Sequence, residues 1–210
     1  MFRKSLSTAR FLIDRYRHGF DVPDQPEFDA DGRAYFLDRL TKASFYLEYG
    51  SGGSTVVAAS LKKPFVTLDS DRLYLESVRK KIAQYDLSNG RLLHANIGIT
   101  TAWGFPLLKT ETHGRLVRWR NYAELPWTYN IRPDLILIDG RFRVHCALYS
   151  ISRLDDFEIL FDDYAGRPHY REVEKFAELE MRGRLAVLKP KPFDGNDLLS
   201  SIRRFSRDYR

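Results

Sequence analysis

Cysteine and long apolar runs are both scarce in this chain of 210 residues. The sequence holds one cysteine, Cys146, which excludes a disulfide bond within the chain. Its neighbours Val144, Ala147 and Leu148 have helical spacing, so we expect Cys146 to be a small core residue. Nothing in this cysteine usage indicates an oxidising compartment.

No segment approaches the roughly 20 apolar residues that a membrane-spanning helix needs. The basic N-terminus lacks the apolar run of a signal peptide, because Phe11-Leu12-Ile13 is bounded by Arg10 and Asp14. We therefore expect a cytoplasmic protein without a membrane span. An amphipathic N-terminal helix that touches a membrane surface is the alternative.

Internal repeats and low-complexity tracts are also absent, and the length, with 43% hydrophobic residues, suits one domain with one core. We expect residues 1–32 to form an N-terminal helix and linker and residues 33–210 to form the core. Lysine and arginine number 34 against 28 aspartate and glutamate residues, which gives a net charge of +6. This excess favours anionic partners such as a nucleotide cofactor or a phosphorylated substrate, or it is an ordinary solvated surface.

Strand-like and helix-like segments alternate along the core. Apolar runs predict strands that end near residue 48 and span 64–68, 91–95, 134–138, 158–161 and 184–188. Helical spacing predicts helices over 1–19, 33–42 and 71–83, and another that carries Val173, Phe176 and Ala177. This alternation predicts an α/β fold, a doubly wound and mostly parallel sheet with an N-terminal helical extension.

The connection between the third and fourth predicted strands is long and has little periodicity. It spans residues 97–131 and contains Trp103, Trp119, Tyr122, Trp127 and Tyr129. Connections of this length are usually lids, binding loops or an extra hairpin. The same aromatic residues could equally form a local core, and the sequence leaves both interpretations open.

The stretch LEYGSGGST, residues 47–55, places a carboxylate and a glycine cluster at the end of the first predicted strand. Ligands bind an open parallel sheet beyond the carboxyl ends of its strands, near the point where strand order reverses. Glycine leaves no side chain between main chain and ligand, and Ser54 or Thr55 can cap the next helix, whose free N–H groups favour an anion. Asp69 ends the second strand, where its carboxylate can accept both hydroxyls of a ribose.

On these residues the chain resembles the class I S-adenosylmethionine-dependent methyltransferases. The matching features are Glu48-x-Gly50-x-Gly52 after the first strand, Asp69 after the second, and Asp139 and Asp162 after the fourth and fifth. The resemblance covers roughly residues 43–190 and implies a Rossmann-like methyltransferase fold with S-adenosylmethionine as cofactor. In that family the glycine loop holds the methionine moiety and the acid of the second strand holds the ribose. The cofactor-binding residues that it implies are Glu48, Gly50, Ser51, Gly52, Gly53, Asp69 and Asp139.

Rossmann dehydrogenases are the competing family for a glycine loop of this kind. They need a glycine three residues after the second one, where this chain has Thr55, and an acid before the first glycine is not usual in them. The methyltransferase pattern is also incomplete, because its third glycine is Ser54 here. The methyltransferase interpretation is the better of the two.

Three aspartates follow neighbouring predicted strands: Asp139 ends the fourth, and Asp162 and Asp163 follow the fifth. Strands about 4.8 Å apart would gather these carboxylates at one edge, a costly arrangement that suits Mg²⁺. The arrangement is similar to that of metal-dependent O-methyltransferases acting on catechols and on the sugars of antibiotics, which implies Asp139, Asp162 and Asp163 as metal ligands. The alternative is that Asp162 caps its loop and Asp163 pairs with Arg167 or Arg171.

The usual general base of those enzymes is missing. The catechol-type enzymes have a lysine three residues after the acid of the fourth strand, and the sugar-type enzymes have an acid two residues after it. This chain has Phe142 and Arg141 there. His145 and His169 are the nearby candidates for the base, and we prefer His169 because His145 falls well inside a predicted helix. Arg141 and Arg143 can instead bind an acidic substrate.

Three functions are compatible with these features. The first is O-methylation of a small molecule or sugar, with an acceptor that is anionic or a glycan, assisted by Mg²⁺. The second is a methyltransferase-like protein that binds the cofactor or a partner without catalysis, because the base is missing. The third is a nucleic-acid methyltransferase, suggested by RLVRWR (115–120) and RRFSRDYR (203–210). No Asn-Pro-Pro-Tyr-type motif follows the fourth strand, so nucleic acid is the least favoured partner.

Overall fold

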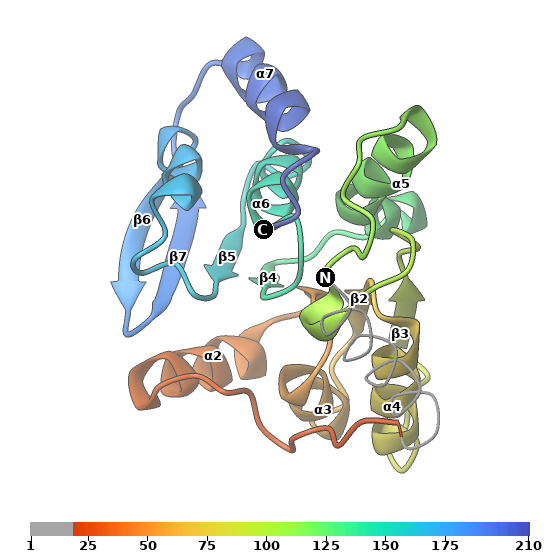
Figure 1. The fold of residues 1–210 in the computed structure, drawn as a ribbon. Helices are drawn as coiled ribbons and strands as arrows, with labels where there is room; N and C mark the ends of the chain where they lie inside the picture. The colour runs from red at the N-terminus through yellow and green to blue at the C-terminus, as the bar shows by residue number, and fades with distance from the viewer. Residues whose placement is uncertain (1–18) are drawn as a thin grey trace.

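The computed structural model describes residues 19–210. Within these residues a central sheet carries helices on both of its faces (Figure 1). The helix predicted for residues 1–19 falls, apart from its last residue, outside the described range. No helix of the described part is long and apolar enough to cross a membrane.

The sheet in this part of the chain has seven strands in the order β3-β2-β1-β4-β5-β7-β6. The first five are parallel, and β7 is antiparallel to both β5 and β6. This confirms a doubly wound, mostly parallel sheet. The strands are β1 (Tyr46–Tyr49), β2 (Phe65–Asp69), β3 (Gly90–His94), β4 (Leu135–Ile138), β5 (Glu158–Phe161), β6 (Ala177–Arg182) and β7 (Leu185–Pro190).

The helices form two layers, one on each face of the sheet (Figure 1). One layer contains α2 (Ala30–Lys42), α3 (Gly53–Ser60) and α4 (Arg72–Ile82). The other contains α5 (His113–Glu124), α6 (Arg143–Ile151) and α7 (Gly195–Phe205). The helix predicted for 33–42 begins earlier, because the Asp29 carboxylate accepts a hydrogen bond from the Gly32 N–H and caps α2.

Alternation along β1 shows why the parallel strands are buried on both faces. Tyr46 packs in the core under α2, α3 and α4, whereas Leu47 and Tyr49 pack in the core under α5 and α6. All four residues of β1 are buried, and so are all residues of β2, β4 and β5. Glu48 therefore lies in a buried strand, on the α3 side of the sheet.

The chain after β5 differs from the prediction. Residues Pro168–Lys175 form the 3-10 helix η3, and Ala177, predicted to be helical, begins strand β6. In β6 the apolar residues Ala177, Leu179 and Met181 alternate with charged ones, which is the period of a strand. Gly183, with φ of +59°, makes the turn to β7. The predicted helix is therefore wrong beyond residue 175, and β6 closes the edge of the sheet.

The connection 97–131 is largely part of the core. It contains the 3-10 helix η1 (Ala102–Gly104), α5 and the 3-10 helix η2 (Leu125–Tyr129). Trp119, Tyr122 and Trp127 are buried against the sheet, whereas Trp103 is 83% exposed. The Trp127 Nε1–H donates to the Tyr49 hydroxyl at 2.8 Å, and that hydroxyl donates to the Ala123 carbonyl at 2.8 Å.

Replacing Tyr49 with phenylalanine tests this attachment. Tyr49→Phe leaves the buried Trp127 N–H and Ala123 carbonyl without their partner, and each orphaned group costs about 1–3 kcal/mol. We expect urea unfolding to show that the free energy of unfolding falls by at least the cost of one such group. The control is Tyr129→Phe, which removes a hydroxyl from an exposed tyrosine of the same connection. Equal stability of the two variants would contradict the attachment.

Candidate active site

The glycine loop after β1 lies at the point where strand order reverses, because β1 pairs with β2 on one side and β4 on the other. Gly50 has φ of +101°. A Cβ atom on Gly50 would lie 2.6 Å from the Gly140 nitrogen, in the loop after β4. Only glycine fits there, so the main chains of the two loops are in direct contact.

Gly52 and Gly53 have different surroundings. Gly52 is the N-cap of α3, and a Cβ atom there would meet the Tyr74 hydroxyl oxygen at 3.4 Å and no other atom closely. A Cβ atom on Gly53 would lie 2.1 Å from the Gln25 carbonyl oxygen, so Gly53 accommodates the chain before α2. Of these two glycines, Gly52 is therefore the one with open space next to its main chain.

Glu48 supports the loop from beneath. Its side chain is fully buried, and its carboxyl group accepts hydrogen bonds from the hydroxyls of Ser54, Thr55 and Thr67. The Thr55 hydroxyl in turn accepts from the Gly52 N–H at 3.0 Å. Burial raises the pKa of Glu48 to about 8, against the lowering effect of those three hydroxyls. With no exposed surface, Glu48 shapes the loop from beneath, and a direct contact of Glu48 with the cofactor stays a prediction.

Asp69 ties the same loop to the end of β2. One carboxylate oxygen accepts from the Ser51 N–H at 2.9 Å and from the Ser51 hydroxyl at 2.7 Å. The other accepts from the Asp71 N–H at 2.8 Å. Burial raises the pKa of Asp69, and these hydrogen bonds oppose the rise. The oxygen that accepts from Asp71 has one lone pair left for a further donor, such as a ribose hydroxyl.

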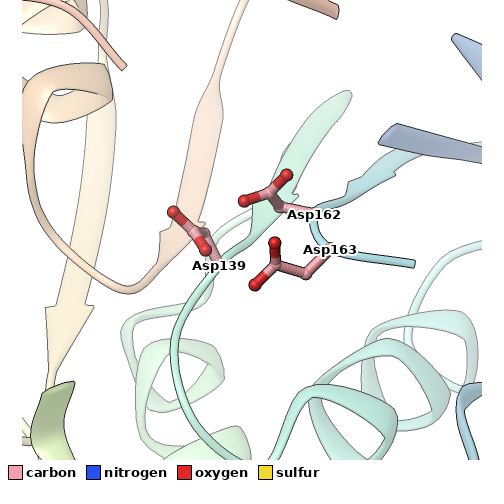
Figure 2. A group of neighbouring side chains, drawn as sticks. All are labelled: Asp139, Asp162 and Asp163. Atoms are coloured by element: carbon pink, nitrogen blue, oxygen red, sulfur yellow. The ribbon is translucent and has the colours of Figure 1, made fainter. Parts of the chain in front are cut away.

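The three predicted aspartates do meet at the edge of the sheet. Asp139 follows β4, Asp162 and Asp163 follow β5, and their side chains converge (Figure 2). One ligand atom from each lies within 4.8 Å of the others. The parallel pairing of β4 with β5 brings these residues together, as the sequence predicted.

Arginine side chains already neutralise this cluster. Arg143 binds Asp139 at 3.0 Å and Asp163 at 3.2 Å. Arg184, from the turn between β6 and β7, donates to both oxygens of Asp162, at 2.9 and 2.6 Å. Asp163 also pairs with Arg167 at 2.8 Å, which is one part of the alternative that the sequence left open, whereas Asp162 binds Arg184.

A divalent cation does not fit the cluster as it stands. The carboxylate oxygens that would bind it already accept from guanidinium groups, and Arg143 would hold its own positive charge beside the ion. These acids do not depend on a metal ion for neutralisation, because three arginines supply the opposite charge. A metal at Asp139, Asp162 and Asp163 stays a prediction, and we assign no chemical step to it.

Arg184 is the residue of this cluster that the sequence did not indicate. It lies 21 residues beyond Asp163 in the chain and follows a segment that was predicted to be helical. Arg184 contacts Asp162 only because the β6–β7 hairpin pairs with β5, and no local sequence pattern predicts this pairing.

Arg141 differs from the other arginines of this edge. It is 8% exposed, and its guanidinium carbon lies 4.2 Å from the centre of the Phe105 ring. Its Nε is buried and has no hydrogen-bond partner among the described residues. The main chain of Gly104 lies near its Cγ, so the η1 segment covers the side chain.

The two candidate histidines are not equivalent. His145 is fully buried, both ring nitrogens lack partners in the described chain, and burial lowers its pKa to about 4. The His169 ring packs on Tyr170, with centroids 4.3 Å apart. Burial lowers the pKa of His169, and the charge of nearby Arg210 lowers it further. A base role for His169 stays a prediction.

Two open hollows lie elsewhere, with volumes of about 970 and 360 Å³. They are lined by residues at the starts of β4 and β5 and by the chain on either side of Pro190. This is the amino edge of the parallel strands, so neither hollow belongs to the site at the carboxyl edge.

Replacing Glu48 with glutamine should change how stability depends on pH. The folded wild type holds its proton up to about pH 8, whereas the unfolded chain releases it near 4.5. The stabilising effect of that proton is complete below pH 4.5 and is lost as pH rises through 8. The wild type therefore loses a few kcal/mol of unfolding free energy as pH rises from 4.5 to 8, and Glu48→Gln, which carries no titrating group there, should not show this loss.

Urea unfolding at several pH values between 4 and 9 checks this, at intervals of about one unit. Glu178→Gln, the same change at an exposed position of β6, serves as the control. Parallel pH profiles for Glu48→Gln and the wild type would refute the buried, protonated carboxyl group.

Removing Arg184 tests charge compensation in the aspartate cluster. Arg184→Ala leaves the buried Asp162 carboxylate unpaired, and we expect a loss of about 2 kcal/mol, since Arg184 is 39% exposed and water can replace part of it. Millimolar Mg²⁺ should raise the Tm of this variant and leave the wild type unchanged.

Arg182→Ala is the matched control, because Arg182 is 40% exposed on the same hairpin and pairs with the exposed Glu180. A Mg²⁺-dependent rise in the Tm of the wild type equal to that of Arg184→Ala would instead support the metal site.

Comparison with known proteins identifies the family. No family model and no curated protein matches the chain. The crystal structure of a methyltransferase-like protein from Silicibacter pomeroyi is 32% identical, with a TM-score of 0.75 over 90% of this chain and 100% of that one. The Podospora anserina methyltransferase PaMTH1, solved with bound SAH, is 14% identical and covers 90% and 96% of the two chains with a TM-score of 0.51, so it shares the fold. At 32% identity over nearly its whole length, this chain belongs to the methyltransferase-like proteins that have the class I methyltransferase fold.

Proposed function

We propose that this protein transfers a methyl group from S-adenosylmethionine to a hydroxyl group of a small molecule. The observation that carries the proposal is the glycine loop at the strand-order reversal. There bare main chain, a carboxylate and a helix N-terminus meet at one edge. The likeness to the Silicibacter protein supports it, and PaMTH1 binds SAH on the same fold.

The residues of the loop suit the cofactor. Gly50 and Gly52 let the main chain approach the methionine moiety, and the first N–H groups of α3 can face its carboxylate. Asp69 would accept from the ribose hydroxyls while it holds Ser51 in place. The cofactor supplies an electrophilic methyl group, and the protein has to orient the acceptor oxygen toward it.

The acceptor side of the reaction depends on residues outside the loop. The main chains after β1 and β4 touch each other at Gly50 and Gly140, so the two loops form one continuous floor under the proposed cofactor site. His169 is the predicted base, and the Arg167 beside it also pairs with Asp163. No metal ion is needed to neutralise the aspartates, so the proposal is methyl transfer by orientation and proton removal.

A cofactor-binding protein without catalysis is the second candidate. The observation that favours it is Phe142, whose side chain is fully buried where the catechol-type enzymes have a lysine. Both candidates require S-adenosylmethionine to bind. They differ in whether a hydroxylated acceptor becomes methylated.

Calorimetry with S-adenosylhomocysteine tests the shared step. We expect the wild type to bind, and Asp69→Asn and Gly52→Leu each to weaken binding by at least about tenfold. Gly52→Leu places a side chain in the space in front of the loop, where only Tyr74 is near. Gly114→Leu, on α5 with open space around it, is the control and should bind as the wild type does.

Failure of the wild type to bind would overturn both candidates. If it binds, labelled S-adenosylmethionine with a panel of hydroxylated aromatics and sugars separates them. Transfer of label to any acceptor supports the enzyme, and tight binding with no transfer supports the binding protein. Label in RNA or DNA would overturn the small-molecule assignment.

A further inference from the structure

Arg141 is a buried cation without a counter-ion in the described chain. It is 8% exposed, yet its guanidinium group has no hydrogen bond and no ion pair with the described residues. Its guanidinium carbon lies 4.2 Å from the centre of the Phe105 ring. A cation over an aromatic ring recovers only about 0.5–2 kcal/mol, which is less than the cost of burying an unpaired charge.

Arg143, two residues further on, has the same side chain and the opposite situation. It is 3% exposed, and its guanidinium group reaches two carboxylates and three main-chain carbonyls. The fold therefore can satisfy a buried arginine at this edge. The acceptors that Arg141 lacks must come from something that the described chain does not contain.

The position of Arg141 shows where such a group would bind. Arg141 lies in the loop between β4 and α6, one residue after Gly140, which touches the glycine loop at Gly50. Above it, the Ser70 hydroxyl donates to the Gly104 carbonyl at 3.1 Å, so the η1 segment is fastened to the end of β2. Arg141 thus follows directly after the contact between the β4 loop and the glycine loop, and its side chain lies against the η1 segment and Phe105, which are fastened to the end of β2.

The start of α6 adds a second feature that favours an anion. Phe142 is the N-cap in a left-handed conformation, and no side chain caps the first turn. Free N–H groups at a helix N-terminus and a guanidinium group both favour carboxylate or phosphate oxygens. Arg143 is already saturated, which leaves Arg141 to provide the charge.

We infer that Arg141 binds an anionic group, a carboxylate or phosphate, on the methyl acceptor. The inference rests on the proposed function and names its substrate class. The acceptor would carry a hydroxyl group to be methylated and an anionic group that anchors it, and the η1 segment with Phe105 would cover the bound anion.

Thermal unfolding with simple anions tests the binding of an anion without any need for catalysis. Inorganic phosphate or benzoate at about 10 mM, against chloride at equal ionic strength, should raise the Tm of the wild type by mass action. Arg141→Met and Arg141→Gln should lose that shift. Arg118→Met, which removes an exposed arginine of α5, should keep it. An equal shift in Arg141→Met and the wild type would overturn the inference.

Stability without added anion is a second and independent measurement. Arg141→Met removes a buried charge that has no ion pair or hydrogen bond in the described chain, so its Tm should be higher than that of the wild type by about 2–4 °C. Arg143→Met removes a charge with five acceptors, so its Tm should be lower. A fall in Tm for Arg141→Met as large as that for Arg143→Met would contradict the unpaired state.

The anion could belong to the cofactor, because S-adenosylmethionine carries a carboxylate of its own. Calorimetry with S-adenosylhomocysteine separates the two sources. Affinity for Arg141→Met within about twofold of the wild type supports the acceptor, and a loss of about tenfold assigns the anion to the cofactor and overturns the inference. If the wild type binds no S-adenosylhomocysteine, the proposed function fails, whereas an Arg141-dependent phosphate shift would still establish the anion site.

Discussion

The hydrogen bonds of the buried Glu48 carboxyl group hold together the part of the fold on which the site depends. They join β1 to Thr67 of β2 and to Ser54 and Thr55 of α3, so two strands and a helix share one polar centre. A buried polar group without partners is costly, and all three hydroxyls are therefore needed in place. Asp69 fixes the other side of the loop through Ser51. The loop is thus held in shape before any ligand arrives, which lowers the entropic cost of binding.

The carboxyl edge of the sheet carries two groups of charges, one that is paired within the described chain and one that is not. The aspartates beyond β4 and β5 are paired with arginines and need no further cation. Arg141, on the other side of Gly140, is buried without an anion in the described chain. The overall excess of +6 pointed only to anionic partners in general. The local arrangement is more specific, because it places one uncompensated guanidinium group beside the loop proposed to hold the cofactor.

The sequence predictions were accurate where a feature depends on local interactions and failed where it depends on contacts between distant parts of the chain. Strands β1 to β5 and β7 were predicted within one or two residues, because apolar runs and turn residues are local signals. Strand β6 was missed because Val173, Phe176 and Ala177 have helical spacing across the junction between η3 and the strand. The lid and core interpretations of 97–131 could not be separated, since burial of Trp119 and Trp127 depends on which layer α5 joins.

The sequence by itself determined the parallel sheet, the glycine loop at its reversal point and the gathering of three aspartates at the ends of β4 and β5. These features follow from strand order and from residues placed directly after strands. Only the tertiary structure decided how the charges are paired, because Arg184 reaches Asp162 from an antiparallel hairpin. It also decided that Arg143 is saturated while Arg141 is not. Charged groups find partners through space, over distances along the chain that no local pattern records.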